Sequence, residues 1–203
     1  MANLLGAVHG RLVHQRRVEV IADVLAPWLP EEGIVADVGS GDGAVAVQIL
    51  ARRPRLRIEG FDVMARPHAA IPVREFDGRR LPLDDRSVDA VILVDVLHHC
   101  DSPGDMLEEA LRVSRRLIVI KDHRLGQPAA RAMLTAMDWV GNRPHGVVLP
   151  FNYWEERRWR ETWDRLGLRV LHYEPTVNLY PFPFSLVLNS GLHFAAALER
   201  REV

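Results

Sequence analysis

The chain has 203 residues, of which 48% are hydrophobic, and its 26 basic and 27 acidic side chains leave a formal net charge of −1. This is the size and composition of one ordinary globular domain. A near-neutral chain lacks the basic surplus with which proteins hold a nucleic-acid backbone, so nucleic acid is not an expected partner. Cys100 is the only cysteine, which excludes an internal disulfide and a cysteine-based zinc site and fits a reducing, cytoplasmic location.

The longest apolar runs are too short to cross a membrane. Residues 90–97 are interrupted by Asp95, whereas a membrane helix needs about 18 or more continuous apolar residues. We therefore expect no stable membrane insertion. The sequence does not predict an oligomeric state.

The amino-terminal part of the chain predicts a helix, a strand, a glycine loop and a second helix. Apolar residues at helical spacing indicate an amphipathic helix of about 14 residues that ends near Pro27. The apolar run 34–38 predicts a strand, the glycine-rich stretch 39–43 follows it, and residues 44–53 resume a helical pattern that Pro54 closes.

Further strands are predicted at 57–62, 73–76, 88–94 and 117–121. A helix begins at Ser102, because a serine cap is followed by proline at the first helical position and an acid three residues on. Only about ten residues, 63–72, join the second and third strands, which predicts a short, distorted crossover.

The second half is less regular. Residues 128–140 predict a helix closed by Gly141, and a capping box of Asn152 and Glu155 predicts another helix through Leu166, closed by Gly167. Two final strands are expected at 168–173 and 192–198, with an aromatic loop over 178–184 between them. Apolar runs that alternate with helices indicate an α/β fold with a parallel sheet covered on both faces.

The segment V-A-D-V-G-S-G-D-G predicts a ligand site at the carboxyl end of the first strand. Glycines let the backbone pass close to a ligand, and the next helix presents unpaired N–H groups. The ligand stays open at this point, because Gly39, Gly41 and Ala44 also satisfy the dinucleotide pattern G-x-G-x-x-A, with Asp62 near the offset of a ribose-binding acid.

Acidic residues at the strand ends favour a cationic ligand. Asp37 precedes the glycine loop, Asp77 follows the third strand and Asp95 follows the fourth, and with Asp62 they would place four carboxylates around one pocket. Such a pocket suits a sulfonium cation with an amino group better than a pyrophosphate, which it would repel. Asp37 and Asp77 therefore disfavour a nicotinamide-dependent oxidoreductase.

Residues 34–123 resemble the class I S-adenosylmethionine-dependent methyltransferases, especially the small bacterial type 11 group. The resemblance rests on V-A-D-V-G-S-G-D-G, G-F-D-V and F-D-G-R-R-L-P-L-D-D-R-S-V-D-A-V-I-L-V-D-V-L-H-H. It implies a Rossmann-like, doubly wound, seven-stranded sheet of order 3-2-1-4-5-7-6 with the last strand antiparallel, in three α/β/α layers. It also implies one domain over 1–203, with a helical cap at 1–30 and a substrate-side insertion at 124–155.

By this resemblance S-adenosylmethionine is the cofactor. The glycine loop would hold the methionyl part, Asp62 the ribose hydroxyls and Asp77 the adenine, while Asp95 would lie near the methionyl amine. The short crossover after Asp62 departs from the family pattern at the ribose pocket. The expected cofactor-binding residues are Asp37, Gly39, Ser40, Gly41, Gly43, Asp62, Val63, Asp77, Gly78 and Asp95.

Histidines are the candidates for the proton chemistry of methyl transfer. The sulfonium is already a strong electrophile, so only a protonated nucleophile needs a base, and an imidazole titrates near working pH. The candidate catalytic residues are His99, His123 and His145, and His98 is adjacent to the first of them. No metal site is expected, since Asp122 and His123 lack an obvious third ligand.

The sequence thus predicts an S-adenosylmethionine-dependent methyltransferase acting on a small-molecule substrate, by O-methylation of an apolar or aromatic compound. Aromatic residues in the later loops, among them Phe151, Tyr153, Tyr180 and Phe182, suit such an acceptor. Two alternatives stay open: a protein that binds S-adenosylmethionine without chemistry, and a methyltransferase of a quinone or lipid.

Overall fold

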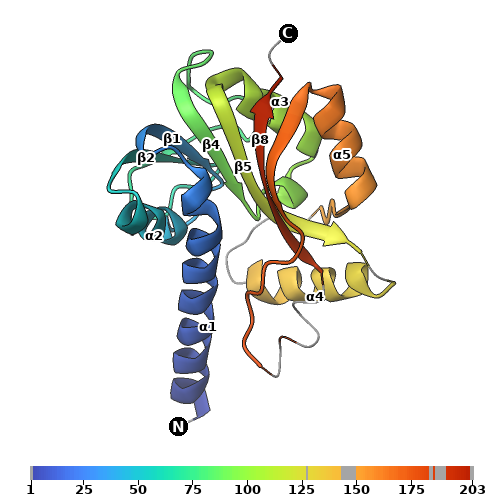
Figure 1. Ribbon diagram of the computed structural model, residues 1–203. Helices are drawn as coiled ribbons and strands as arrows, with labels where there is room; N and C mark the ends of the chain where they lie inside the picture. Colours follow the sequence, from blue (N-terminus) through green and yellow to red (C-terminus); the bar gives the residue numbers. More distant parts are fainter. Residues whose placement is uncertain (1, 127, 143–149, 183–184, 186–190, 202–203) are drawn as a thin grey trace.

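A twisted sheet of order β3-β2-β1-β4-β5-β8-β7 runs through the centre of the computed structural model (Figure 1). The structure describes residues 2–126, 128–142, 150–182, 185 and 191–201. The strands are β1 (Glu32–Val38), β2 (Arg55–Asp62), β3 (Val73–Glu75), β4 (Val88–Val94), β5 (Ser114–Leu125), β7 (Leu168–Glu174) and β8 (His193–Arg200), and a two-residue β6 (Trp154–Glu155) pairs with the end of β5.

Strands β1 to β5 are parallel, and β8 runs antiparallel to both β5 and β7. Apart from the added β6, this is the strand order predicted for the fold, with the last strand antiparallel as expected. Because the ends of parallel strands share one edge, the segments that follow β1, β2, β4 and β5 meet there.

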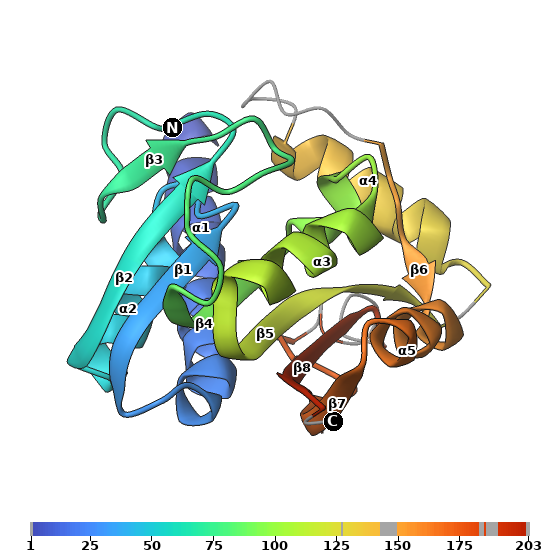
Figure 2. The ribbon, with the colours of Figure 1, turned by 90° about the horizontal axis from the view of Figure 1, so that it is seen from above.

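Helices cover both faces of the sheet, which confirms the three-layer architecture. They are α1 (Ala2–Leu25), α2 (Ala44–Arg52), α3 (Pro103–Val113), α4 (Ala130–Asn142) and α5 (Glu156–Arg165), with short 3₁₀ turns η1 (Ala26–Trp28) and η2 (Leu97–His99). Helices α1 and α2 pack on the face that carries Val35 and Ile92, and α3 and α5 on the face that carries Ala36 and Leu93 (Figure 2). Alternate residues of each strand thus enter opposite cores.

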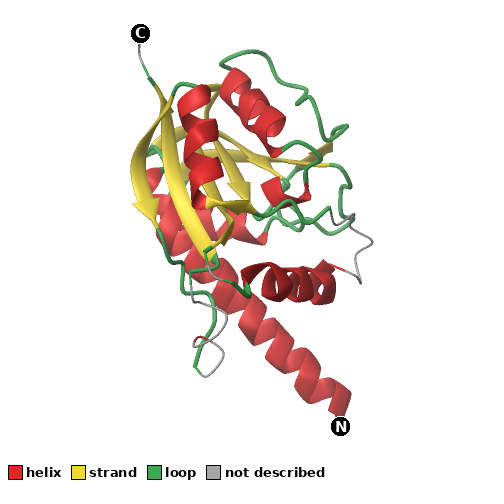
Figure 3. Cartoon of the chain, turned by 90° about the vertical axis from the view of Figure 1, so that its right-hand side faces the viewer, coloured by secondary structure: helices red, strands yellow, loops and turns green. Residues whose placement is uncertain are grey.

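Helix α1 is 24 residues long, ten more than the apolar pattern indicated. Its carboxyl-terminal part packs on the sheet through Ile21, Ala22 and Leu25, and its amino-terminal part runs past the sheet edge. Figures 1 and 3 show α1 and α4 on the same side of the molecule, below the edge to which β5 points. These two helices flank the carboxyl ends of the central strands.

Several predicted element boundaries are wrong, two of them because of a tertiary contact. Strand β5 continues to Leu125, since its last residues pair with β8 and β6. Helix α4 runs through Gly141 to Asn142. Asn152 does not cap α5, because its side-chain amide donates to the carbonyl of Cys100 at 2.7 Å, and α5 begins four residues later.

The crossover 63–72 is short and irregular, as predicted, and it contains no helix. It folds back onto the glycine loop, where the Ala70 N–H donates to the Asp42 carbonyl at 2.8 Å. Ile71 is buried beside Gly43. The short connection therefore forms one wall of the loop.

Candidate functional site

The loop between β1 and α2 adopts a backbone that only glycine readily adopts. Gly39 and Gly43 have φ values of +71° and +75°. A Cβ at Gly39 would lie 2.3 Å from Val96 Cγ2, and one at Gly43 would lie 2.7 Å from Ile71 Cγ1. Each glycine thus combines a left-handed conformation with close approach of a neighbour, so side chains are excluded at both positions.

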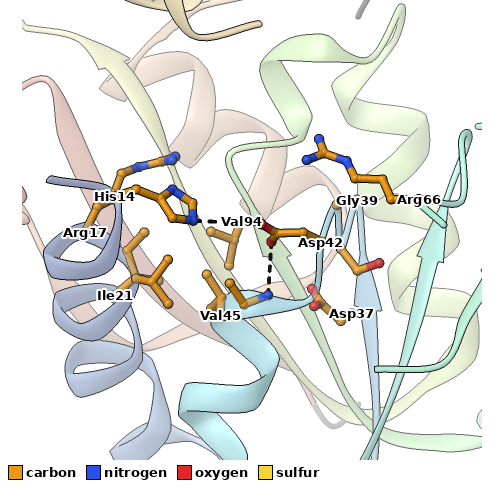
Figure 4. Close-up of a pocket in the computed structure, with 13 residues that line it drawn as sticks. His14, Arg17, Ile21, Asp37, Gly39, Asp42, Val45, Arg66 and Val94 are labelled. Carbon is orange, nitrogen blue, oxygen red and sulfur yellow. Dashed lines mark hydrogen bonds and ion pairs between the residues drawn. The ribbon is translucent and has the colours of Figure 1, made fainter. Parts of the chain in front are cut away.

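A cavity of about 220 Å³ lies between this loop and α1 (Figure 4). Its walls are formed by α1, the end of β1, the glycine loop, the start of α2, the crossover and the end of β4. The lining residues are His14, Arg17, Val18, Ile21, Asp37, Gly39, Ser40, Gly41, Asp42, Ala44, Val45, Arg66 and Val94. His14 and Asp42 face each other across it at 3.8 Å. Helix α1 therefore supplies one wall of the site.

Asp37 and Ser40 line this cavity and carry buried polar atoms. Asp37 is 3% exposed, and burial, followed by the nearby charge of Asp62, raises the pKa of its carboxyl to about 7. The buried Oγ of Ser40 has no hydrogen-bond partner within the described part of the chain. Buried polar groups in this state are normally completed by a ligand or water.

Asp62 and Asp77 lie at the ends of the two outer strands. Both oxygens of Asp62 accept backbone hydrogen bonds, from Gly41 at 2.9 Å and from Met64 at 3.0 Å. Asp77 is exposed and accepts from the amides of Arg80 and Arg79, which lower the pKa of its carboxyl. These acids order the loops around them.

Val63 and Gly78 meet beside these two acids. Val63 is 64% exposed, and a Cβ at Gly78 would lie 3.0 Å from its Cγ1. Their contact brings the turn after β2 against the turn that follows β3.

Asp95 occupies a different environment from the other three acids. It has a φ of +53°, and its carboxylate accepts hydrogen bonds from Arg17 of α1 and from Lys121 of β5, the latter at 2.5 Å. Lys121 is fully buried. The structure therefore places Asp95, like Asp62 and Asp77, outside the lining of the cavity, and two cations of the protein meet the charge of Asp95.

A buried cluster of histidines and acids adjoins this ion pair. His98 Nδ1 lies 2.6 Å from Asp122 Oδ1, and His98 Nε2 lies 3.3 Å from Asp138 Oδ2. Tyr153 donates to the Asp138 carboxylate. The five residues that form this cluster (His98, Asp122, His123, Asp138 and Tyr153) come from η2, β5, α4 and the segment before β6. We call them the histidine cluster.

The sheet register and the turn after β4 bring the imidazoles together. His123 is the cross-strand partner of His193, and its Nδ1 lies 3.2 Å from His98 Nδ1. Burial by itself would lower the pKa of His98, but Asp122 and Asp138 raise it to about 10. Burial and then the charge of His98 lower the pKa of His123.

Of the three predicted catalytic histidines, the structure brings two into this region. His123 is in the cluster, and the His99 ring lies 4.0 Å from that of His98. Burial and then the His98 charge lower the pKa of His99 to about 4. His145 lies outside the described residues.

Sequence reasoning missed Arg17, Lys121, Asp138 and His193 as members of this region. The only signal in the sequence was a polar residue inside an apolar pattern, as in I-V-I-K-D-H.

Comparison with known families identifies the domain. Residues 36–117, from β1 into β5, match the type 11 family described as a methyltransferase domain. This segment is a type 11 methyltransferase domain. It is accordingly a domain of an S-adenosylmethionine-dependent methyltransferase.

Solved structures share the fold of this methyltransferase at low sequence identity. A chain of the complex between the Haloferax volcanii Trm112 methyltransferase activator and a methyltransferase has 16% identity and a TM-score of 0.74, with 98% of this chain and 96% of that chain covered. A methyltransferase from Mesorhizobium loti has 16% identity, coverages of 88% and 96%, and a TM-score of 0.64. Magnesium protoporphyrin IX methyltransferase from Synechocystis PCC 6803, with bound SAH, has 16% identity, coverages of 94% and 85%, and a TM-score of 0.62.

No curated protein sequence matches the methyltransferase significantly. Within the described residues, no helix is long and apolar enough to span a bilayer.

The cavity fits the methyl donor of this family. The buried Asp37 and the Arg66 guanidinium both line the cavity and are suited to the ammonium and carboxylate groups of such a ligand. S-adenosylmethionine supplies an activated methyl group on a sulfonium. The protein's own residues then have to hold that group in line with the acceptor and exclude water.

Asp37 makes the stability of the methyltransferase depend on pH. Its folded pKa of about 7 exceeds the ordinary value of 3.8, so the folded state holds the proton more tightly and stability falls as pH rises from about 4 to 7. Asp37→Asn should remove this fall, which we place on the order of 3–4 kcal/mol. Urea unfolding of parent and variant at pH 4 and pH 8 measures it, and an equal difference at both pH values would contradict the prediction.

Proposed function

We propose that the methyltransferase transfers the methyl group of S-adenosylmethionine to an oxygen of a small apolar or aromatic acceptor. The observation that carries this proposal is the buried group of imidazoles and carboxylates beside the cofactor cavity. A hydroxyl acceptor must lose a proton as its oxygen bonds to the methyl carbon, and imidazoles are suited to take it. The carbon–sulfur bond breaks, and the sulfonium leaves as the neutral thioether S-adenosylhomocysteine.

The acceptor would enter between the helical cap at 1–30 and the substrate-side insertion at 124–155. Arg17 of the cap reaches Asp95 at the end of β4. Asp138 of the insertion reaches His98 after the same strand. Both segments thus converge on one edge of the sheet, where the cofactor's methyl group would be presented.

Aromatic rings border this region and support an apolar or aromatic acceptor. The Tyr180 ring lies 6.0 Å from that of His193, and the Phe151 ring lies 6.2 Å from that of Tyr153. Flat apolar walls of this kind favour ring-shaped ligands. Quinones and lipids with apolar parts would fit the same walls and belong in any acceptor panel.

For the cofactor we propose that the sequence-predicted residues hold it, with Asp62 as the most direct test. Asp62→Ala removes the acceptor that orders Gly41 and should weaken S-adenosylhomocysteine binding about 10- to 100-fold, the loss expected for one or two charge-assisted hydrogen bonds. Calorimetry measures the affinity. Asp23→Ala, which removes an exposed carboxylate paired with Arg52, is the matched control, and equal affinities in the two variants would contradict the assignment.

Turnover decides between an enzyme of this acceptor class and a protein that only binds the cofactor. Formation of S-adenosylhomocysteine is followed with phenols, aliphatic alcohols, a quinol, a lipid and amines. We expect turnover with hydroxyl acceptors and its loss in His99→Gln or His123→Gln with S-adenosylhomocysteine affinity retained. Cofactor binding with no turnover across the panel would favour the binding protein.

A further inference from the structure

Three donor atoms of the histidine cluster converge on one point. His98 Nδ1 lies 3.2 Å from His123 Nδ1 and 2.6 Å from Asp122 Oδ1. His123 Nδ1 lies 3.6 Å from the same Asp122 oxygen. All three side chains are buried. We propose that these three residues bind a divalent first-row transition-metal ion such as zinc.

The distances fit the ligand shell of such an ion. Bonds of about 2.0–2.1 Å to nitrogen and oxygen in tetrahedral geometry separate neighbouring ligand atoms by about 3.4 Å. The two longer separations, 3.2 and 3.6 Å, bracket this value. The shortest is that of a hydrogen bond, and it would open by under about 1 Å when an ion replaces the proton between His98 and Asp122.

The surroundings of the three ligands are those of a metal site. The second ring nitrogen of His98 faces the carboxylate of Asp138 at 3.3 Å, and Tyr153 holds that carboxylate in turn. Asp122 Oδ2 accepts from the Leu97 amide at 3.0 Å, and Oδ1 accepts from the His123 amide at 2.6 Å. Metal-bound histidines and carboxylates are oriented by such outer hydrogen bonds.

Protons alone leave this arrangement incompletely paired. If His98 Nδ1 carries a hydrogen, that N–H donates to Asp122. The Nδ1 of His123 then receives no hydrogen bond from His98. If His123 carried the hydrogen instead, Asp122 at 3.6 Å would be too distant to accept it. An ion between the three atoms gives each lone pair a partner.

Two other groupings of nearby donors are less suited to an ion. Asp95 approaches His123 and His193, but Arg17 and Lys121 already bind its carboxylate and would repel a cation. Asp138 approaches His98 and His99, but it accepts from Tyr153. The proposed site therefore has three protein ligands, which is the number found in catalytic metal sites.

His98 is the third ligand, which the sequence alone did not identify. Asp122 and His123 are adjacent at the end of β5, whereas His98 is supplied by η2 after β4. An acceptor hydroxyl that binds the ion as a fourth ligand would have a lowered pKa and would lose its proton more readily. That role rests on the proposed methyltransferase function, whereas the ion site itself does not.

Cobalt(II) is the probe, because its visible absorption reports the ligand shell. We expect the chelator-stripped full chain to bind one Co²⁺ tightly, with visible absorption bands and a raised melting temperature. His123→Gln and Asp122→Asn should each weaken Co²⁺ binding at least about 10- to 100-fold. His172→Gln, which removes an exposed imidazole stacked on Trp28, should leave Co²⁺ binding unchanged.

Each outcome has a defined meaning. Absence of tight Co²⁺ binding by the stripped parent chain, or affinity unchanged in a folded His123→Gln variant, overturns the site. If both variants fail to fold by circular dichroism, the parent chain decides: two paramagnetically shifted histidine ring N–H resonances support the site, and their absence overturns it. S-adenosylhomocysteine binding is measured in the same samples to separate the two proposals. If the chain binds S-adenosylhomocysteine but not Co²⁺, only the ion site is overturned. If it does not bind S-adenosylhomocysteine, the proposed methyltransferase function is overturned.

Discussion

Gly39→Ala is expected to abolish measurable S-adenosylhomocysteine binding and to lower the free energy of unfolding by about 2–4 kcal/mol. The residue has a φ of +71°, and the new methyl group would lie 2.3 Å from Val96 Cγ2 and 2.7 Å from Val96 Cβ. Relief requires the loop or the turn after β4 to move. Either movement changes the cavity wall, so binding and stability should fall together.

Gly167→Ala is the matched control for this prediction. Its φ of +66° is close to that of Gly39, but no atom lies within 4 Å of the position that its Cβ would take. It should cost about 1–2 kcal/mol from the left-handed backbone alone and leave binding unchanged. Calorimetry and urea unfolding of both variants measure these effects. Equal stability losses, or normal binding by Gly39→Ala, would show that contact with Val96 does not matter.

Asp95→Asn is expected to destabilise the protein by about 3–5 kcal/mol, the cost of breaking a buried ion pair. Lys121 is fully buried and Asp95 is its hydrogen-bonded carboxylate. Without that charge, Lys121 and Arg17 remain close together as two cations at the sheet edge. The variant should also loosen α1, because Arg17 is the residue by which this helix reaches Asp95.

A double-mutant cycle with Lys121→Met tests this account. If the ion pair is the cause, the double variant should be less destabilised than the sum of the two single variants, because it does not leave the buried Lys121 charge without its partner. Asp23→Asn, at an exposed pair with Arg52, should cost less than about 1 kcal/mol. A similarly small cost for Asp95→Asn in urea unfolding would contradict the prediction.

Local chemistry explains how much of the fold can be predicted. The runs 34–38 and 88–94, the glycine loop between β1 and α2, and the cap at Ser102 each depend on residues within one or two turns of chain, and the structure confirms them. The strand order followed from the family resemblance. Some of the wrong boundaries involve distant partners, as with Asn152, whose amide binds a carbonyl more than fifty residues away.

The sequence by itself determined that this chain is an α/β protein with a glycine loop after its first strand, because periodicity and turn chemistry are local properties. Only the tertiary structure decided which polar residues meet. His98, Asp122, Asp138 and Tyr153 are buried in one cluster, and Arg17 and Lys121 share Asp95. Their meeting depends on which strand ends adjoin and on where α1 and α4 pack, and no spacing along the chain records those distances.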